Sequence, residues 1–142
     1  MSDGPRRADA EALGRHQYVQ LTTFRRSGAP VPSPVWIAPD GEDLLVVTVD
    51  GTGKTKRLAH TARVELRPCD VRGTVADDAP RYAATATVHR DAASVARVKR
   101  ALGAKYGWWY RALTRVEPAL DRLPGRRPRA AIVVSGVVPL GS

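Results

Sequence analysis

Residues 43–58 read DLLVVTVDGTGKTKRL and join an apolar strand to a short basic helix through a glycine-rich turn. Three cations lie in the first turn of that helix: Lys54, Lys56 and Arg57. A helix N-terminus carries partial positive charge and unsatisfied backbone N–H groups, so each exposed cation there costs about 0.3–1 kcal/mol. Backbone N–H groups freed by Gly51 and Gly53 add to the positive potential. The sequence therefore predicts that a phosphate or a similar anion binds at this turn.

The P-loop of nucleotide triphosphatases is the first motif to compare, because Gly53-Lys54-Thr55 reproduces its last three residues. That motif requires a glycine five residues before Gly53. Thr48 stands at that position, inside the apolar strand. A nucleotide triphosphatase is therefore not expected, and the alternative without any ligand is a basic helix start surrounded by solvent.

The composition indicates one globular domain over residues 1–142, with 43% hydrophobic and 26% charged residues. The only cysteine, Cys69, excludes an intramolecular disulfide and a cysteine-cluster metal site, which fits a reducing interior. The polar start shows no secretion signal, and no apolar run approaches the ~18 residues that cross a bilayer. We therefore expect a cytoplasmic protein that holds no metal.

The net charge of +9 favours an acidic partner. Much of the excess lies in residues 97–129, where ten basic residues meet only Glu117 and Asp121. No recognition helix, zinc-ligand spacing or aromatic ribonucleoprotein motif is visible, so nucleic acid is not the expected partner. The alternative interpretation of this segment is an ordinary solvated surface.

Alternating and apolar runs predict six β-strands. They cover residues 18–24, 31–37, 43–49, 64–67, 82–88 and 130–138. Pro32 and Pro34 cannot donate to a ladder, so the second strand is expected at an edge, at a bulge or against a ligand. Three helices are expected as well, at 7–15, at about 53–61, and after an N-cap at Asp91.

These elements describe a mainly β fold, a six-stranded antiparallel barrel of Greek-key type with flanking helices, in which closure removes exposed edges. Turns are expected at Ser27-Gly28, at Pro39-Asp40-Gly41 and within 69–73. The long helix carries an apolar stripe of Val95, Val98, Leu102, Tyr106, Trp109 and Leu113. Residues 117–128 are expected to form a loop.

Over residues 14–138 the chain resembles the pyridoxamine-phosphate-oxidase-like split β-barrels (FMN-binding split-barrel type), specifically the B class of coenzyme F420-dependent oxidoreductases. Five motifs carry the resemblance in this order: LTTFRRxGxP at 21–30, SPVW at 33–36, GKxKRL at 53–58, RVxLxPCDxRG at 63–73, and KYG at 105–107. Residues 1–13 would be an extension of that barrel.

The resemblance implies a homodimer that binds a flavin or deazaflavin in a groove between its subunits. By position, Lys54 would hold the phosphate, supported by Thr52, Gly53, Lys56 and Arg57. The ring would lie against Ser33, Pro34, Val35 and Trp36, with Thr48 and Val49 beside the ring or its side chain. Arg72 would either serve its own turn, next to Asp70, or reach the cofactor from the partner subunit.

Many flavin-binding relatives carry an arginine where Thr52 stands, so the resemblance implies coenzyme F420 rather than FMN. The implied activity is hydride transfer between reduced F420 and a small electron-poor organic substrate. No catalytic residue is assigned, since Tyr106, Tyr110 and His89 each have a structural alternative. The arginines in 111–129 would meet the acidic cofactor tail. An FMN oxidase or reductase, and a non-catalytic module that binds haem or another cofactor, remain alternatives.

Overall fold

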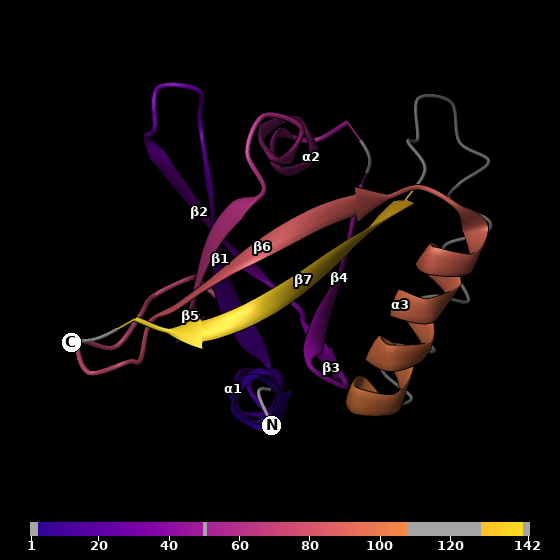
Figure 1. Cartoon of the computed structure of the whole chain (residues 1–142), viewed down its shortest axis with the longest axis horizontal. Coiled ribbons are helices and arrows are strands. Elements are labelled where there is room, and N and C mark those ends of the chain that lie inside the picture. Colours follow the sequence, from indigo (N-terminus) through magenta and orange to yellow (C-terminus); the bar gives the residue numbers. More distant parts are fainter. Residues whose placement is uncertain (1–2, 50, 108–128, 141–142) are drawn as a thin grey trace.

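The computed structural model describes residues 3–49, 51–107 and 129–140. Three helices and seven strands follow in the order shown in Figure 1. They are α1 (Asp3–Gly14), β1 (Tyr18–Phe24), β2 (Pro30–Val35), β3 (Ala38–Asp40), β4 (Asp43–Val49), α2 (Gly53–Leu58), β5 (Arg63–Cys69), β6 (Tyr82–His89), α3 (Ala92–Tyr106) and β7 (Arg129–Pro139).

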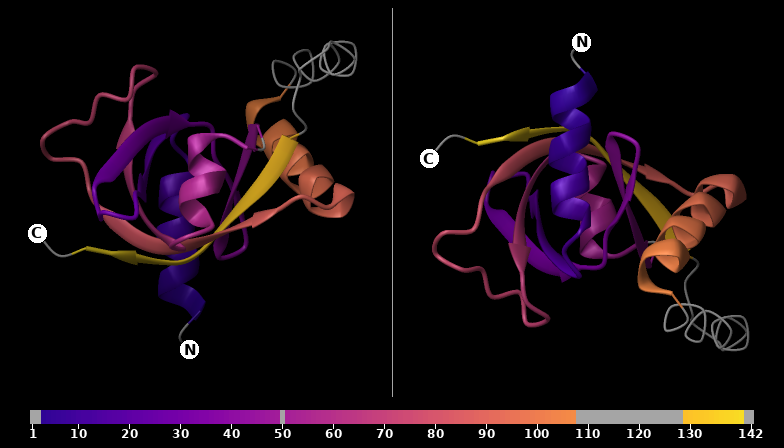
Figure 2. Two further views of the ribbon diagram at one scale, coloured as in Figure 1. Left: turned by 90° about the horizontal axis from the view of Figure 1, so that it is seen from above. Right: turned by 90° about the horizontal axis from the view of Figure 1, so that it is seen from below.

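All seven strands form one antiparallel sheet with the order β2-β1-β5-β6-β7-β4-β3. Its two outermost strands, β2 and β3, are consecutive in the chain and are separated only by Trp36 and Ile37. Three Cα–Cα steps of ~3.8 Å cover that connection, so the two edges lie within about 11 Å of each other at this point. The sheet must therefore curl, and Figure 2 shows its strands wrapping around a central axis.

Side chains at the end of α3 hydrogen-bond the backbone of this connection. The Tyr106 hydroxyl accepts from the Ile37 N–H at 3.3 Å and lies 2.6 Å from the Gln17 carbonyl, its nearest acceptor. Lys105 Nζ donates to the Ile37 carbonyl at 2.5 Å and also to the His16 carbonyl. The Trp36 ring stacks on the Tyr106 ring, with centroids 4.6 Å apart. Groups from α3 therefore take the place of a strand partner at Ile37.

The predicted closed barrel of six strands needs correction. The described residues form seven strands, because residues 38–40 pair with β4 as an additional short strand. None of the described pairings joins β2 to β3, so the ladder is not closed. In the connection between these strands, both backbone groups of Ile37 are bound by side chains of α3, Tyr106 and Lys105.

Strand β2 lies at one end of the sheet order, as its prolines predict. The register pairs Pro30, Pro32 and Pro34 with Phe24, Thr22 and Gln20. Since proline has no N–H, the β2 donors to β1 must be Val31, Ser33 and Val35. The prolines leave the outer edge of β2 without N–H donors at three alternate positions, which opposes edge-to-edge pairing with another strand.

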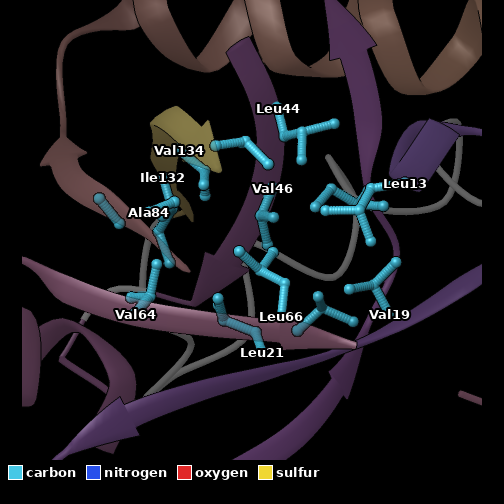
Figure 3. Close-up of a cluster of buried hydrophobic side chains, with 14 of the residues drawn as sticks. Leu13, Val19, Leu21, Leu44, Val46, Val64, Leu66, Ala84, Ile132 and Val134 are labelled. Atoms are coloured by element: carbon cyan, nitrogen blue, oxygen red, sulfur yellow. The ribbon is translucent and has the colours of Figure 1, made fainter. Parts of the chain in front are cut away.

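The inner face of the curled sheet forms the main core. Figure 3 shows Val19, Leu21, Leu66 and Val46 converging there, together with side chains from β5, β6 and β7. Helices α1 and α2 cross the two openings of the sheet (Figure 2) and contribute Leu13 and Leu58 to the same cluster. The α2 end is thus fixed to the core by a buried leucine.

Helix α3 packs outside the sheet in a second cluster that includes Val98, Leu102 and Leu45. Its predicted N-cap is confirmed, because the Asp91 carboxylate accepts from the Ser94 N–H at 3.0 Å. Turns are confirmed around Gly28, Gly41 and Gly73, each of which has a positive φ. The stripe residues Trp109 and Leu113 and the loop expected at 117–128 lie outside the described residues.

Within the described ranges, no helix has the length and hydropathy of a membrane span. In the same ranges, no group of three or more His, Cys, Asp or Glu side chains is arranged to hold a metal ion.

The contacts of α3 with the β2–β3 connection predict a pH-dependent stability. Burial lowers the pKa of Lys105 from 10.5 to about 8 and raises the pKa of Tyr106 from 10.0 to about 12. Between about pH 8 and 10.5 the unfolded chain holds a proton that folded Lys105 has lost, so stability rises with pH. Between about pH 10 and 12 folded Tyr106 keeps a proton that the unfolded chain loses, so stability falls.

Urea unfolding across this pH range tests the prediction. Lys105→Met should remove part of the rise, and Tyr106→Phe should remove part of the fall. A Lys105→Met profile parallel to that of the wild type would contradict the assignment.

Candidate functional site

One end of the curled sheet carries a concentration of positive charge. Helix α2 crosses this opening next to the turn that joins β1 to β2 (Figure 1). We call this region the basic end and define it by Arg25, Arg26, Lys54, Lys56 and Arg57. The two segments that carry these cations, residues 12–39 and 51–64, contain no Asp or Glu that could neutralise them.

A buried threonine fixes the turn that leads into α2. Thr55 is only 2% exposed, and its hydroxyl donates to the Thr52 carbonyl at 3.0 Å while accepting from the Gly51 N–H at 3.1 Å. Gly51 has φ 79°, a conformation that favours glycine. The threonine of the P-loop-like tripeptide therefore serves the turn itself. Sequence reasoning did not find this role of Thr55.

Lys54 is half-buried directly after this turn. Burial lowers the pKa of its ammonium group, and the nearby Arg57 charge lowers it further. No acceptor from the described residues contacts the ammonium group. The Thr52 hydroxyl beside it is buried and, within the described part of the chain, has no hydrogen-bond partner. The turn thus holds a cation and a hydroxyl that lack partners among the residues that the structure describes.

Arg57 is bound to the sheet by a neutral group. Its Nε donates to the Thr23 hydroxyl on β1 at 2.6 Å. A Cβ atom added to Gly53 would lie 2.5 Å from Nη1 of Arg57, so the guanidinium packs against the bare Cα of that glycine. Burial lowers the pKa of Arg57, and the charge of Arg25 lowers it further. Arg57 is therefore oriented while its charge remains uncompensated.

The other cations of the basic end are more exposed. Lys56 is exposed, and Arg26 Nε donates to Nε2 of His60 at 3.1 Å. That bond requires an unprotonated Nε2 on His60, because only the lone pair of a neutral imidazole accepts.

The residues expected beside the ring lie on different sides of β2. Ser33 and Val35 pair with Leu21 and Val19, which face the core, whereas Pro34 is exposed on the other side. The Ser33 hydroxyl is buried and has no hydrogen-bond partner among the described residues. Trp36 stacks at the connection to β3, away from the basic end (Figure 1).

Thr48 and Val49 end strand β4, where they pair with Ala130 and Arg129. Thr48 is 8% exposed. Both residues immediately precede the turn at Gly51. The structure therefore brings Thr48 and Val49 to the same end of the sheet as Lys54.

Arg72 lies in an exposed turn that the Asp70 side chain holds together. Oδ1 of Asp70 accepts from the backbone N–H groups of Arg72 at 2.9 Å and of Thr74 at 2.8 Å. No ion pair between the Arg72 guanidinium and Asp70 occurs in the described structure. A Cβ atom on Gly73 would lie 3.4 Å from Pro34, so this turn adjoins β2.

The three candidates for protonating or orienting substrate differ in their surroundings. Tyr106 is bound to backbone groups of Gln17 and Ile37 at the far end of the sheet. His89 Nε2 lies 2.8 Å from the Thr87 hydroxyl. Tyr110 and the arginines of 111–128 lie outside the described residues. The packing interpretation of Tyr106 is therefore the one that its contacts favour.

Comparison with known proteins gives one family match and several structural similarities. The family model described as pyridoxamine 5'-phosphate oxidase matches residues 6–135. No curated protein matches the sequence. A conserved hypothetical protein from Mycobacterium tuberculosis is similar in structure, with a TM-score of 0.64 and 18% identity over 89% of this chain and 77% of the other.

Two further solved structures carry functional names. An F420 reductase is 20% identical over 92% of this chain and 93% of its own, with a TM-score of 0.54. The heme storage protein HutZ from Vibrio cholerae is 14% identical over 93% of this chain and 89% of its own, with a TM-score of 0.59. At these identities the similarity establishes the fold alone.

The turn before α2 yields a stability prediction. Thr55→Val should cost about 1–3 kcal/mol of unfolding free energy, because it leaves the partly buried Gly51 N–H without this acceptor and removes the bond to Thr52. Thr55→Ser should retain both bonds and most of the stability. Equal urea midpoints for the valine and serine variants would contradict the role assigned to this hydroxyl.

Proposed function

Because the chain belongs to the pyridoxamine 5'-phosphate oxidase family, we propose that its basic end binds the anionic arm of a redox cofactor, coenzyme F420. In this proposal the protein is an F420-dependent oxidoreductase that transfers a hydride between reduced F420 and a small electron-poor organic substrate. It acts as a homodimer, in which the partner subunit completes the cofactor groove.

The observation that carries this proposal is the uncompensated charge at the basic end. Two arginines elsewhere in the described structure have acidic partners: Arg81 lies 2.9 Å from Glu65, and Arg97 lies 2.7 Å from Asp40. Burial instead lowers the pKa of both Lys54 and Arg57. The charge of Arg57 lowers the pKa of Lys54 further, and the charge of Arg25 lowers the pKa of Arg57 further. An oxyanion placed between them would reverse this repulsion and form charge-assisted hydrogen bonds.

The residues fit the phosphodiester of F420 in number and kind. Lys54 and Arg57 supply charged donors, and the buried Thr52 hydroxyl supplies a neutral group that lacks a described partner. Lys56 lies one residue beyond Thr55 as a further cation. FMN is the alternative ligand, but Thr52 stands where many flavin-binding relatives carry an arginine. The net charge of +9 also suits a cofactor whose tail bears several carboxylates.

When bound, the deazaflavin supplies hydride chemistry at its central ring carbon. The protein's contribution is to bind, orient and exclude water. Lys54, Lys56, Arg57 and Thr52 hold the anionic arm, and the bare Cα of Gly53 leaves room for the Arg57 guanidinium. Ser33, Pro34, Val35 and Trp36 border the ring, with Thr48 and Val49 next to the arm. Arg72 extends from the turn beside β2 and is available to a cofactor that the two subunits share.

A cofactor titration tests this function. Lys54→Ala should weaken F420 binding by about 10- to 150-fold, since a hydrogen bond to a charged group contributes about 1.5–3 kcal/mol. Lys99→Ala, on α3, is the matched lysine control and should bind as the wild type does. Binding is read from cofactor fluorescence, and FMN and haem are titrated in parallel. Wild-type protein that binds haem tightly and F420 not at all would contradict the proposal.

The charge of the site predicts a dependence on ionic strength. Affinity for F420 should fall as salt is raised, because the cations of the basic end are partly exposed and are screened over about 10 Å at 0.1 M. Titration at a series of sodium chloride concentrations measures the slope. An affinity that does not change with salt would argue against an electrostatic contact.

A further inference from the structure

We propose that Thr23 is a positioning residue for anion binding: its buried hydroxyl on β1, together with the bare Cα of Gly53, fixes the Arg57 guanidinium in the orientation that receives an oxyanion. The identity of the natural ligand, coenzyme F420, is taken from the proposed function, and the inference rests on it to that extent. It adds a residue that contacts no ligand itself and that no sequence motif assigned.

The Thr23 hydroxyl belongs to a rigid element. Thr23 is 1% exposed and lies on β1 opposite Val31 of β2. Its Oγ1 accepts from Nε of Arg57 at 2.6 Å, a short distance for an N–H···O bond. This bond joins α2 to the sheet across 34 positions of sequence. The strand thus sets the position of Nε, and the planar guanidinium follows.

Gly53 limits the guanidinium from its other side. A Cβ atom on this residue would lie 2.5 Å from Nη1 and 3.3 Å from Nη2 of Arg57. Separations under about 3 Å are not tolerated between such atoms, so any larger residue would displace the end of the side chain. Thr23 and Gly53 therefore restrict the same group from two elements, β1 and α2.

Arg57 differs from Arg97 in the charge of its partner. Arg97 is held by the carboxylates of Asp40 and Asp43, and these charges raise its pKa. A carboxylate partner both accepts hydrogen bonds from the guanidinium and neutralises its positive charge. The Thr23 hydroxyl accepts a hydrogen bond but carries no negative charge, so the positive charge of Arg57 is not neutralised. Its Nη groups have no acceptor among the described residues.

A guanidinium with its Nε bound presents the remaining N–H donors of Nη1 and Nη2. Two parallel N–H groups match two oxygens of a phosphate, which is the geometry of a bidentate contact. Holding the side chain in place before binding reduces the entropy that the complex loses. The ligand class is therefore a phosphate oxyanion, and Lys54 supplies a second charge.

The experiment compares Thr23→Val, which keeps the shape but removes the acceptor, with Thr23→Ser, which keeps the acceptor. Arg57→Ala and the Thr23→Val/Arg57→Ala double variant complete the cycle. Affinities for F420 and, separately, for inorganic pyrophosphate are measured by fluorescence and calorimetry. Urea unfolding confirms that each variant is folded at the assay temperature.

We expect Thr23→Val to lower affinity about tenfold and Thr23→Ser to restore it to within about twofold. In the absence of Arg57, the valine substitution should have no further effect, which a purely structural role would not produce. Equal affinities for Thr23→Val and wild type, or losses that add in the double variant, would overturn the inference.

The outcomes separate this inference from the proposed function. If the wild type binds F420 but Thr23→Val binds it equally, the cofactor assignment stands and the positioning role fails. If the wild type binds pyrophosphate but not F420, and Thr23→Val weakens pyrophosphate binding, the positioning role stands and the cofactor assignment fails. If neither ligand binds, both are wrong.

Discussion

The structure depends on the two-residue connection between the outermost strands of its sheet. Strands β2 and β3 are the first and the last in the strand order, yet only Trp36 and Ile37 separate them in the chain. This short connection forces the sheet to curl around its core. Tyr106 and Lys105 hold this connection by binding the backbone of Ile37 and the carbonyls of His16 and Gln17, which directly precede β1. A helix outside the sheet thereby fixes the shape of the sheet.

That curl creates two ends with different chemistry. At one end, the Trp36 ring stacks on the Tyr106 ring, and the Tyr106 hydroxyl accepts from the Ile37 N–H. At the other end, α2 crosses the opening and holds Lys54 and Arg57 close to each other at an energetic cost, since each has a pKa lowered by burial and by a neighbouring cation. Folding energy from the buried Leu58 and Thr55 maintains this arrangement. A cluster of this kind is stabilised when an anion binds.

Local patterns in the sequence were sufficient for most of the secondary structure. Alternating apolar residues located β1 and β4 at their observed bounds, and Asp91 marked the start of α3 because its side chain can cap a helix. The short strand β3 was missed, since Ala38-Pro39-Asp40 has no strand composition and pairs only because β4 lies beside it. A closed barrel was wrongly expected, because no local pattern in the sequence shows whether the two outermost strands, β2 and β3, pair with each other.

In the candidate site too, features within one segment of sequence could be predicted, whereas contacts between distant segments could not. The cations of 54–57 and the prolines of β2 are visible in the sequence, and the resemblance grouped them with Ser33 and Thr48. Thr23 was not found, since its contact with Arg57 spans 34 positions and a threonine in a strand is ordinary. That Ser33 and Pro34 face opposite sides does follow from the predicted strand, because consecutive side chains of a strand alternate between its two faces.

The central claim is that Lys54 and Arg57 bind the anionic arm of a redox cofactor. A crystal structure of the protein with coenzyme F420 tests it most directly. The account predicts phosphodiester oxygens within about 3 Å of Lys54 Nζ and of the Arg57 Nη groups, with Arg57 still bound to Thr23. A complex in which the phosphodiester lies elsewhere, and both side chains extend into solvent, would contradict it.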